Sequence, residues 1–154
     1  MTTTNKVAML AAATLALACG TAWAGETVTY TGSGTYVSNQ LTMTLGNGDT
    51  VFGARNQSVA TISTSPPTLL FGKCMGLGLI TGDDDYTADV YCTFRANDQD
   101  SFDIKGKTGS KGGTAEIIGG SGKWAGARGS ANMKRTSQEA NGGTYTFELE
   151  ITTP

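Results

Sequence analysis

The chain has 154 residues, with 11 lysines and arginines against 13 aspartates and glutamates, and it contains no histidine. Its formal charge of −2 includes no basic excess, which argues against a nucleic-acid partner, because phosphate backbones are bound by clusters of positive charge. The absence of histidine excludes Ser-His-Asp triads, Cys-His pairs and histidine-ligated metals, and we expect no metal site.

The first 24 residues have the organisation of a secretory signal peptide. Residues 1–6 are polar with one positive charge, residues 7–18 are apolar, and Ala22-Trp23-Ala24 is a small-x-small cleavage site. The apolar run is too short to cross a bilayer as a helix. The sequence therefore predicts cleavage after Ala24, a β-barrel domain over residues 25–154, and a secreted or periplasmic location.

Cys19 provides an alternative to simple export. The stretch Leu17-Ala18-Cys19-Gly20 loosely resembles a bacterial lipoprotein processing site, although Ala16 stands where leucine is usual. Lipidation at Cys19 would anchor the protein to a membrane, and this is the only membrane contact we expect. Signal cleavage leaves two cysteines, Cys74 and Cys92, and an exported chain with two cysteines is expected to form a disulfide.

The composition predicts an all-β domain. Glycine accounts for 22 residues, about twice its average usage, and no mature stretch has a convincing helical period. Short runs of alternating residues are separated by turn clusters, as in β-sandwiches and barrels. About 130 mature residues are enough for a single core.

The first half of the chain alternates between strands and turns. Gly46-Asn47-Gly48-Asp49 is a strong hairpin signal. In the strand before it, Leu41 and Met43 share one face and Thr42 and Thr44 share the other, the pattern of a half-buried strand. The strands expected here are Thr27–Tyr30, Tyr36–Leu45, Thr50–Arg55 and Val59–Ser63.

The next two strands, Leu70–Ile80 and Tyr86–Arg95, flank a turn at Gly82–Asp85. A hairpin centred on Asp83 places Cys74 directly opposite Cys92, so the hairpin and the disulfide predict each other. The same register places small residues opposite larger ones, as expected in a curved sheet. The expected pairs are Gly72 with Phe94, Gly76 with Val90 and Gly78 with Ala88.

The other face of this hairpin contains two candidate catalytic residues, Asp89 and Tyr91, near Met75, Leu77 and Leu79. An aspartate among aliphatic side chains could have a raised pKa and serve as an acid. The alternative is that Asp89 lies in solvent at the barrel surface and has no chemical role.

The C-terminal half contains the expected strands Phe102–Lys107, Ala115–Ile118 and Ser130–Arg135, and a last strand after Asn141-Gly142-Gly143. The last strand has the clearest alternation in the chain. Its apolar face consists of Tyr145, Phe147, Leu149 and Ile151. A chain ending on such a strand is consistent with a closed barrel, which leaves no exposed sheet edge.

The stretch Ile117-Ile118-Gly119-Gly120-Ser121-Gly122-Lys123-Trp124, followed by Ala127-Arg128-Gly129, resembles a signature of dirigent proteins and, more loosely, of the allene oxide cyclase group. The resemblance implies a single antiparallel calycin-type barrel of about eight strands with a central cavity. In dirigent proteins that cavity guides the coupling or cyclisation of aromatic intermediates without a cofactor. The family's arginine faces the ligand, which implicates Arg128. The family's acidic residues have no clear counterpart here, and its trimeric habit makes a homo-oligomer possible.

The same stretch also has a structural interpretation. Glycines allow the chain to turn over a barrel rim, with Trp124 closing the barrel end and Arg128 in solvent. Either face of the following strand could line the lumen: the face containing Ala131 and Met133, or the face containing Arg128 and Lys134.

Three functional hypotheses follow. The first is a barrel that binds a small apolar or aromatic ligand, with Arg128 and Trp124 as the ligand-binding residues. The second is a cofactor-free, dirigent-like or cyclase-like enzyme with Arg128 as an electrostatic clamp and Asp89 or Tyr91 transferring a proton. The third is a structural or surface-interaction module whose barrel is filled by its own side chains.

Overall fold

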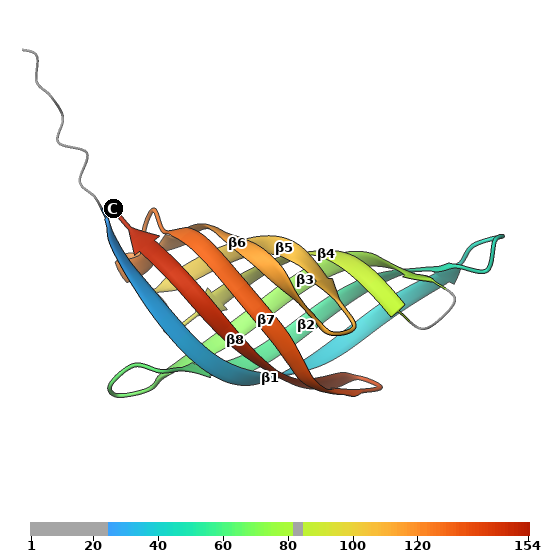
Figure 1. Cartoon of the computed structure of the whole chain (residues 1–154), viewed down its shortest axis with the longest axis horizontal. Helices are drawn as coiled ribbons and strands as arrows, with labels where there is room; N and C mark the ends of the chain where they lie inside the picture. Colours follow the sequence, from blue (N-terminus) through green and yellow to red (C-terminus); the bar gives the residue numbers. More distant parts are fainter. Residues whose placement is uncertain (1–24, 82–84) are drawn as a thin grey trace, which may run out of the picture.

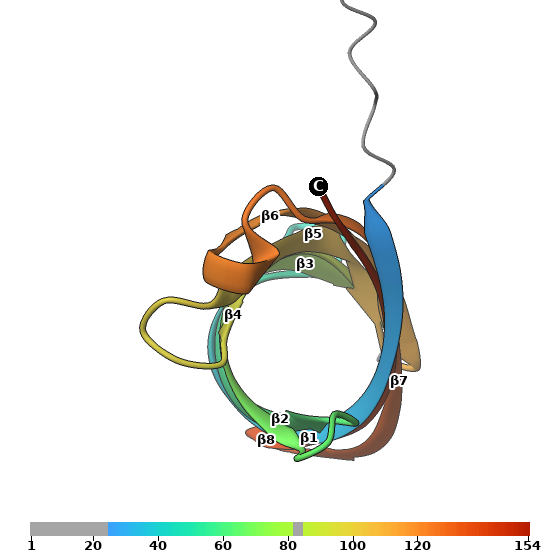
Figure 2. The same ribbon diagram turned by 90° about the vertical axis from the view of Figure 1, so that its left-hand side faces the viewer.

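The computed structural model describes residues 25–81 and 85–154, which form one closed barrel of antiparallel strands in sequence order (Figures 1 and 2). The strands are β1 (Glu26–Thr44), β2 (Thr50–Ile62), β3 (Thr68–Thr81), β4 (Asp85–Arg95), β5 (Ser101–Gly109), β6 (Gly112–Ser121), β7 (Arg128–Glu139) and β8 (Gly142–Thr153). Pairing of β1 with β8 closes the barrel, which confirms the predicted fold class. The expected signal peptide and the turn centre at Asp83 lie outside the described residues. The described part contains no helix long and apolar enough to cross a membrane.

The first two strands are longer than the sequence pattern predicted. β1 runs unbroken through Gly32 and Gly34, and β2 runs unbroken through Asn56-Gln57-Ser58, so the predicted breaks at these points are wrong. Glycine is required inside β1 because the barrel wall is crowded there. A Cβ atom on Gly34 would lie 2.7 Å from the Tyr145 hydroxyl oxygen. These glycines therefore mark close packing against the neighbouring strand β8 and not a turn.

The β3–β4 hairpin has the predicted register. Cys74 lies opposite Cys92 and forms the predicted disulfide, with 4.0 Å between the two Cα atoms. The three pairs of small and large residues predicted from the same register are also observed. The disulfide is consistent with an oxidising, extracellular environment.

The two ends of the barrel differ in packing. One end contains the continuous core, with Phe102, Ile62, Leu70 and Ile117 as its most deeply buried side chains. The 3-10 turn η1 (Gly122–Trp124) lies at this end and places Trp124 edge-on against Phe102, with 5.1 Å between ring centroids. The other end, where the β1–β2 and β7–β8 hairpins turn, is not packed in this way.

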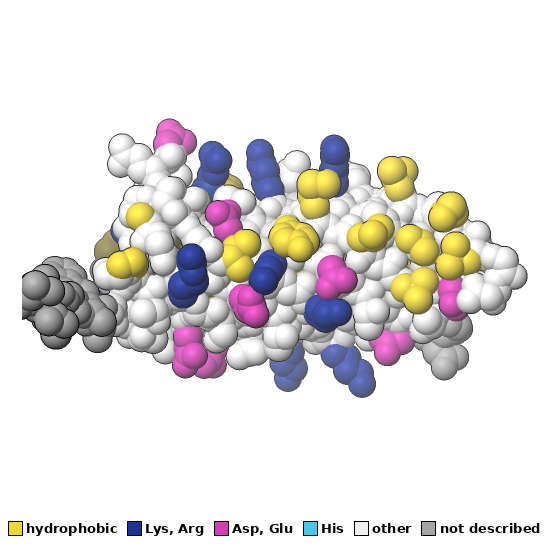
Figure 3. All heavy atoms as spheres, turned by 90° about the horizontal axis from the view of Figure 1, so that it is seen from above, with side chains coloured by type: hydrophobic (Ala, Val, Ile, Leu, Met, Phe, Trp, Pro, Cys, Tyr) yellow, Lys and Arg dark blue, Asp and Glu magenta, His cyan; other side chains and the backbone are white. Residues whose placement is uncertain are grey.

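The outer surface is also asymmetric. Large exposed apolar side chains gather on β1 to β4, and Figure 3 shows many of them toward the end where the β1–β2 hairpin projects. Leu41 is 84% exposed, so the apolar face of β1 that the alternation marked as the buried one is in fact the outer face. The inner face of the same segment carries Ser38 and Gln40, which line the barrel cavity.

Candidate ligand-binding cavity

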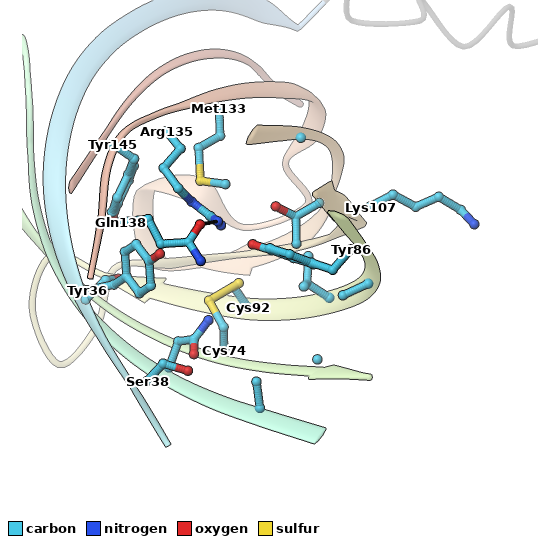
Figure 4. A pocket seen from close by; sticks show the side chains of 18 of the residues that line it. Tyr36, Ser38, Cys74, Tyr86, Cys92, Lys107, Met133, Arg135, Gln138 and Tyr145 are labelled. Atoms are coloured by element: carbon cyan, nitrogen blue, oxygen red, sulfur yellow. Dashed lines mark hydrogen bonds between the residues drawn. A yellow bond between two sulfur atoms is a disulfide. The ribbon is translucent and has the colours of Figure 1, made fainter. Parts of the chain in front are cut away.

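A cavity of about 530 Å³ occupies the open half of the barrel (Figure 4). Every strand contributes to its lining. The residues that line it include Tyr36, Ser38 and Gln40 of β1, Phe52, Ala54, Asn56 and Ser58 of β2, Cys74, Gly76 and Ile80 of β3, Tyr86, Ala88, Val90, Cys92 and Phe94 of β4, Ile104 of β5, Ala115 of β6, Met133, Arg135 and Gln138 of β7, and Tyr145 of β8. Because the lumen contains a cavity of this size, the hypothesis of a barrel filled by its own side chains is not supported.

Small residues on the inner face create this space. Ala54 lies opposite Gly76 in the β2–β3 pair, and Ala88 lies opposite Gly78 in the β3–β4 pair. In the closed half, large side chains such as Ile62, Leu70 and Phe102 fill the lumen, and the two halves meet at Phe94. This ring lines the cavity and stacks on Phe102 at a centroid distance of 5.3 Å, so Phe94 forms the cavity floor.

The cavity wall contains unpartnered polar atoms. In the part of the chain that the structure describes, four buried side-chain atoms lack a hydrogen-bond partner: Asn56 Oδ1, Ser58 Oγ, Arg135 Nε and Tyr145 Oη. All four residues line this one cavity. Leaving such an atom unsatisfied costs roughly 1–3 kcal/mol, and because each of the four exposes less than 1 Å², a ligand in the cavity would reach them only after a side-chain shift.

Arg135 is the central polar residue of the cavity. Its guanidinium lies between the rings of Tyr36 and Tyr86, at 5.6 and 5.3 Å from their centroids, and its Nη1 donates a 2.6 Å hydrogen bond to Gln138 Oε1 (Figure 4). The register of the β7–β8 pair shifts between Arg135 and Ser137, so the irregularity lies between Arg135 and its hydrogen-bond partner Gln138. Cation–π contacts on two sides hold the guanidinium plane in the lumen.

Arg135 makes no ion pair with any residue that the structure describes, since the two ion pairs found there join Lys105 to Glu116 and Lys107 to Asp89. Lys107 also borders the cavity, but its amine points away from it (Figure 4) and lies 3.5 Å from Asp89 Oδ1. Glu139 borders the mouth and is exposed. The cavity therefore contains an uncompensated positive charge.

Two cavity tyrosines, Tyr36 and Tyr145, are held in their protonated form. Burial raises the pKa of Tyr36 above its ordinary value, an effect that the Arg135 charge partly offsets and Tyr86 reinforces. Burial also raises the pKa of Tyr145, with a smaller opposing effect from nearby Ser58, although the two hydroxyls do not meet hydrogen-bond geometry. Both phenols can therefore donate hydrogen bonds at neutral pH.

The structure places the two predicted catalytic residues, Asp89 and Tyr91, outside this cavity. Asp89 and Tyr91 face outward on β4, where Asp89 pairs with Lys107 and Tyr91 is 61% exposed. The odd-numbered positions of β4 face solvent because the even-numbered Cys92 faces the lumen. Their position gives no support to a catalytic role.

Arg128 and Trp124 also lie away from the cavity. Arg128 is exposed, and its Nη1 donates to the backbone carbonyls of Ile118 and Ala127. Trp124 is only 2% exposed and fills the closed end. The ligand-binding role inferred for these two residues therefore has no support from their positions.

Of the two faces of β7, the one with Ala131 and Met133 lines the lumen. Arg135 lies on the same face, because alternate residues of a strand share a face.

Comparison with solved structures identifies the class of fold. The pterocarpan synthase dirigent protein GePTS1 has a TM-score of 0.54 and 14% identity, covering 82% of this chain and 88% of that one. The pterocarpan synthase dirigent protein PsPTS1 has a TM-score of 0.51 and 13% identity, covering 84% and 96% respectively. No protein-family model and no curated protein sequence matches. The chain therefore has the barrel fold of the dirigent proteins, as the stretch from Ile117 to Gly129 indicated, and this similarity concerns the fold alone.

Proposed function

We propose that this protein is exported and binds a small, largely apolar or aromatic molecule in the open half of its barrel. The observation that carries the proposal is a lumen cavity with mostly apolar walls that contains the guanidinium of Arg135, which has no ion-pair partner among the described residues. A cavity of about 530 Å³ is within the usual size range of small-molecule sites. Apolar walls supply affinity, and a few fixed polar groups orient the ligand.

Export is supported by two independent features. The first 24 residues have the pattern of a signal peptide, and the Cys74–Cys92 disulfide suits an oxidising compartment. The ligand would then be one that the protein meets outside the cytoplasm.

A second candidate is a cofactor-free enzyme that guides the coupling or cyclisation of an aromatic substrate. It is favoured by the likeness of the barrel to solved dirigent proteins named as pterocarpan synthases and by the cluster of Tyr36, Tyr86 and Arg135. In this cluster Arg135 would stabilise negative charge developing on the substrate, and a tyrosine hydroxyl would transfer a proton. When an added one-electron oxidant converts a phenol to its radical, coupling in solution gives a racemic product, so addition of an enzyme of this kind would give one enantiomer in excess on chiral chromatography.

Cavity binding is tested with the neutral fluorophore N-phenyl-1-naphthylamine and a pair of matched variants. Ala54→Trp fills the lumen, whereas Gly53→Trp adds the same side chain on the outer face, where a Cβ meets no atom within 4 Å. We expect the wild type and Gly53→Trp to bind the probe with similar affinity, and Ala54→Trp to bind it at least about tenfold more weakly. Equal binding by all three proteins would place the probe on the apolar outer face and contradict the proposal.

A further inference from the structure

The guanidinium of Arg135 is a charge without a partner in an otherwise mostly apolar cavity. Arginine stays protonated in proteins, and a partly buried charge is costly unless it is paired. Among the described residues, neither ion pair involves Arg135, and the only acidic side chain bordering the cavity is the exposed Glu139. The cavity is therefore electrostatically incomplete when it contains only protein.

We propose that the ligand of this cavity is a small aromatic acid whose anionic group pairs with Arg135. This inference rests on the proposed function, because it names the chemical class of the molecule bound in the same cavity. The shared chemistry is an anion, such as a carboxylate or sulfonate, attached to an apolar ring system.

The geometry around Arg135 suits an anion in the lumen. The rings of Tyr36 and Tyr86 flank the guanidinium, and Gln138 accepts one hydrogen bond from Nη1. Nη2 makes no hydrogen bond to a described residue and, unlike Nε, is not among the buried atoms, so its donors remain available to a ligand. The Tyr36 hydroxyl can supplement it, because burial keeps this phenol protonated.

The rest of the cavity suits the aromatic body of the same ligand. Val90, Ile104 and the Phe94 floor present apolar surface, and the Cys74–Cys92 disulfide forms part of the wall. A ligand with its ring against this surface and its acid group on Arg135 would bury apolar area and complete the charge pair together. An apolar ligand without the acid group would leave the guanidinium uncompensated.

The inference is tested by comparing two fluorophores that share one ring skeleton. 1-Anilinonaphthalene-8-sulfonate carries a sulfonate, and N-phenyl-1-naphthylamine lacks it. Affinities are measured for the wild type, Arg135→Met and the control Lys134→Met, which removes a neighbouring positive charge from the exposed face of β7. Fluorescence that persists in Ala54→Trp comes from the outer surface and is subtracted.

We expect the wild type to bind the sulfonate probe at least about tenfold more tightly than the neutral probe, because a hydrogen bond to a charged group is gained. Arg135→Met should remove this preference, so that the two probes bind this variant with similar affinity, while Lys134→Met should keep the preference of the wild type. Gln138→Glu provides a second route: its carboxylate would pair with Arg135 and weaken only the sulfonate probe. Circular dichroism melting curves establish whether each variant is folded. If Arg135→Met does not fold, Gln138→Glu alone decides whether Arg135 binds the anionic group.

The outcomes separate this inference from the proposal on which it rests. The assignment of an acidic ligand is overturned, with the binding function intact, if the neutral probe binds in the cavity and the sulfonate probe binds no more tightly. It is also overturned if the preference for the sulfonate survives in both Arg135→Met and Gln138→Glu. If neither probe binds in a manner sensitive to Ala54→Trp, the binding function fails and the inference fails with it.

Discussion

Removal of the Cys74–Cys92 disulfide gives a defined stability change, because this cross-link contributes little to the packed core. The two sulfur atoms lie in the wall of the cavity, so replacing both cysteines with alanine creates little new void in the core. What remains is the loss of the constraint on the unfolded chain. For a sequence separation of 18 residues, the chain-entropy model gives a loss of about 3 kcal/mol.

The double variant Cys74→Ala/Cys92→Ala should therefore lower the free energy of unfolding by about 3 kcal/mol in urea and lower Tm by roughly 10 °C. Reduction of the wild type with a phosphine should produce the same shift, and it should have no effect on the double variant. A loss below about 1 kcal/mol in the double variant would show that the cross-link does not act through the unfolded chain. Two free thiols in the oxidised wild type would refute the pairing itself.

Further predictions concern the closed end, the crowded wall and the buried phenol. Trp124→Ala should cost about 3–5 kcal/mol of unfolding free energy in urea, because it empties the closed end, whereas Arg128→Ala should cost less than about 1 kcal/mol and leave probe binding unchanged. Equal costs would contradict the packing described for that end. Gly34→Ala should cost about 1–3 kcal/mol, because its Cβ would contact the Tyr145 hydroxyl, whereas Gly53→Ala on the open outer face should stay within about 0.5 kcal/mol. Because the pKa of Tyr145 is raised above the ordinary 10.0, the folded state retains a proton that the unfolded chain loses, so stability present below pH 10 declines as pH rises through the folded pKa. Tyr145→Phe should make the decline shallower, and an unchanged slope would show that this phenol is not responsible.

The sequence predicted the register of the β3–β4 hairpin correctly, because two independent constraints on that register agree. The turn after Ile80 and the positions of Cys74 and Cys92 specify one register, and the small residues opposite Val90 and Phe94 fit the same register. Cross-strand pairing is a local property of a hairpin, so the two strands contain enough information to determine it. The closing strand β8 was also clear, because its inner face packs against the core and its outer face is polar throughout.

The course of β1 and β2 could not be predicted, because it depends on distant neighbours. Gly32 and Gly34 resemble turn residues in isolation, but the ring of Phe147 and the hydroxyl of Tyr145 on the paired strand β8 require glycine there. The alternation of Leu41 and Met43 predicted the wrong buried face for β1, because apolar side chains normally lie on the inner face and here they cover the outer one.

The residues that line the cavity were not predicted, for a related reason. The glycine-rich stretch drew attention to Arg128, while the arginine in the lumen is Arg135, on the same strand but on the opposite face. A register irregularity by Ser137 and the rings of Tyr36 and Tyr86 define its position. The inner face of β7 follows from barrel closure, which no local pattern reveals.

The Phe94 floor, with Phe102 stacked on it and Trp124 edge-on to Phe102, closes one end of the cavity that the described residues form. A molecule that enters must leave by the same route, so a second molecule cannot displace the first from behind. Exchange of one ligand for another is then limited by departure of the first, and its rate becomes independent of the concentration of the incoming ligand. In a stopped-flow displacement experiment, the observed rate constant would level off at the dissociation rate constant of the bound ligand. The residence time would then depend on the bound ligand and not on its competitors.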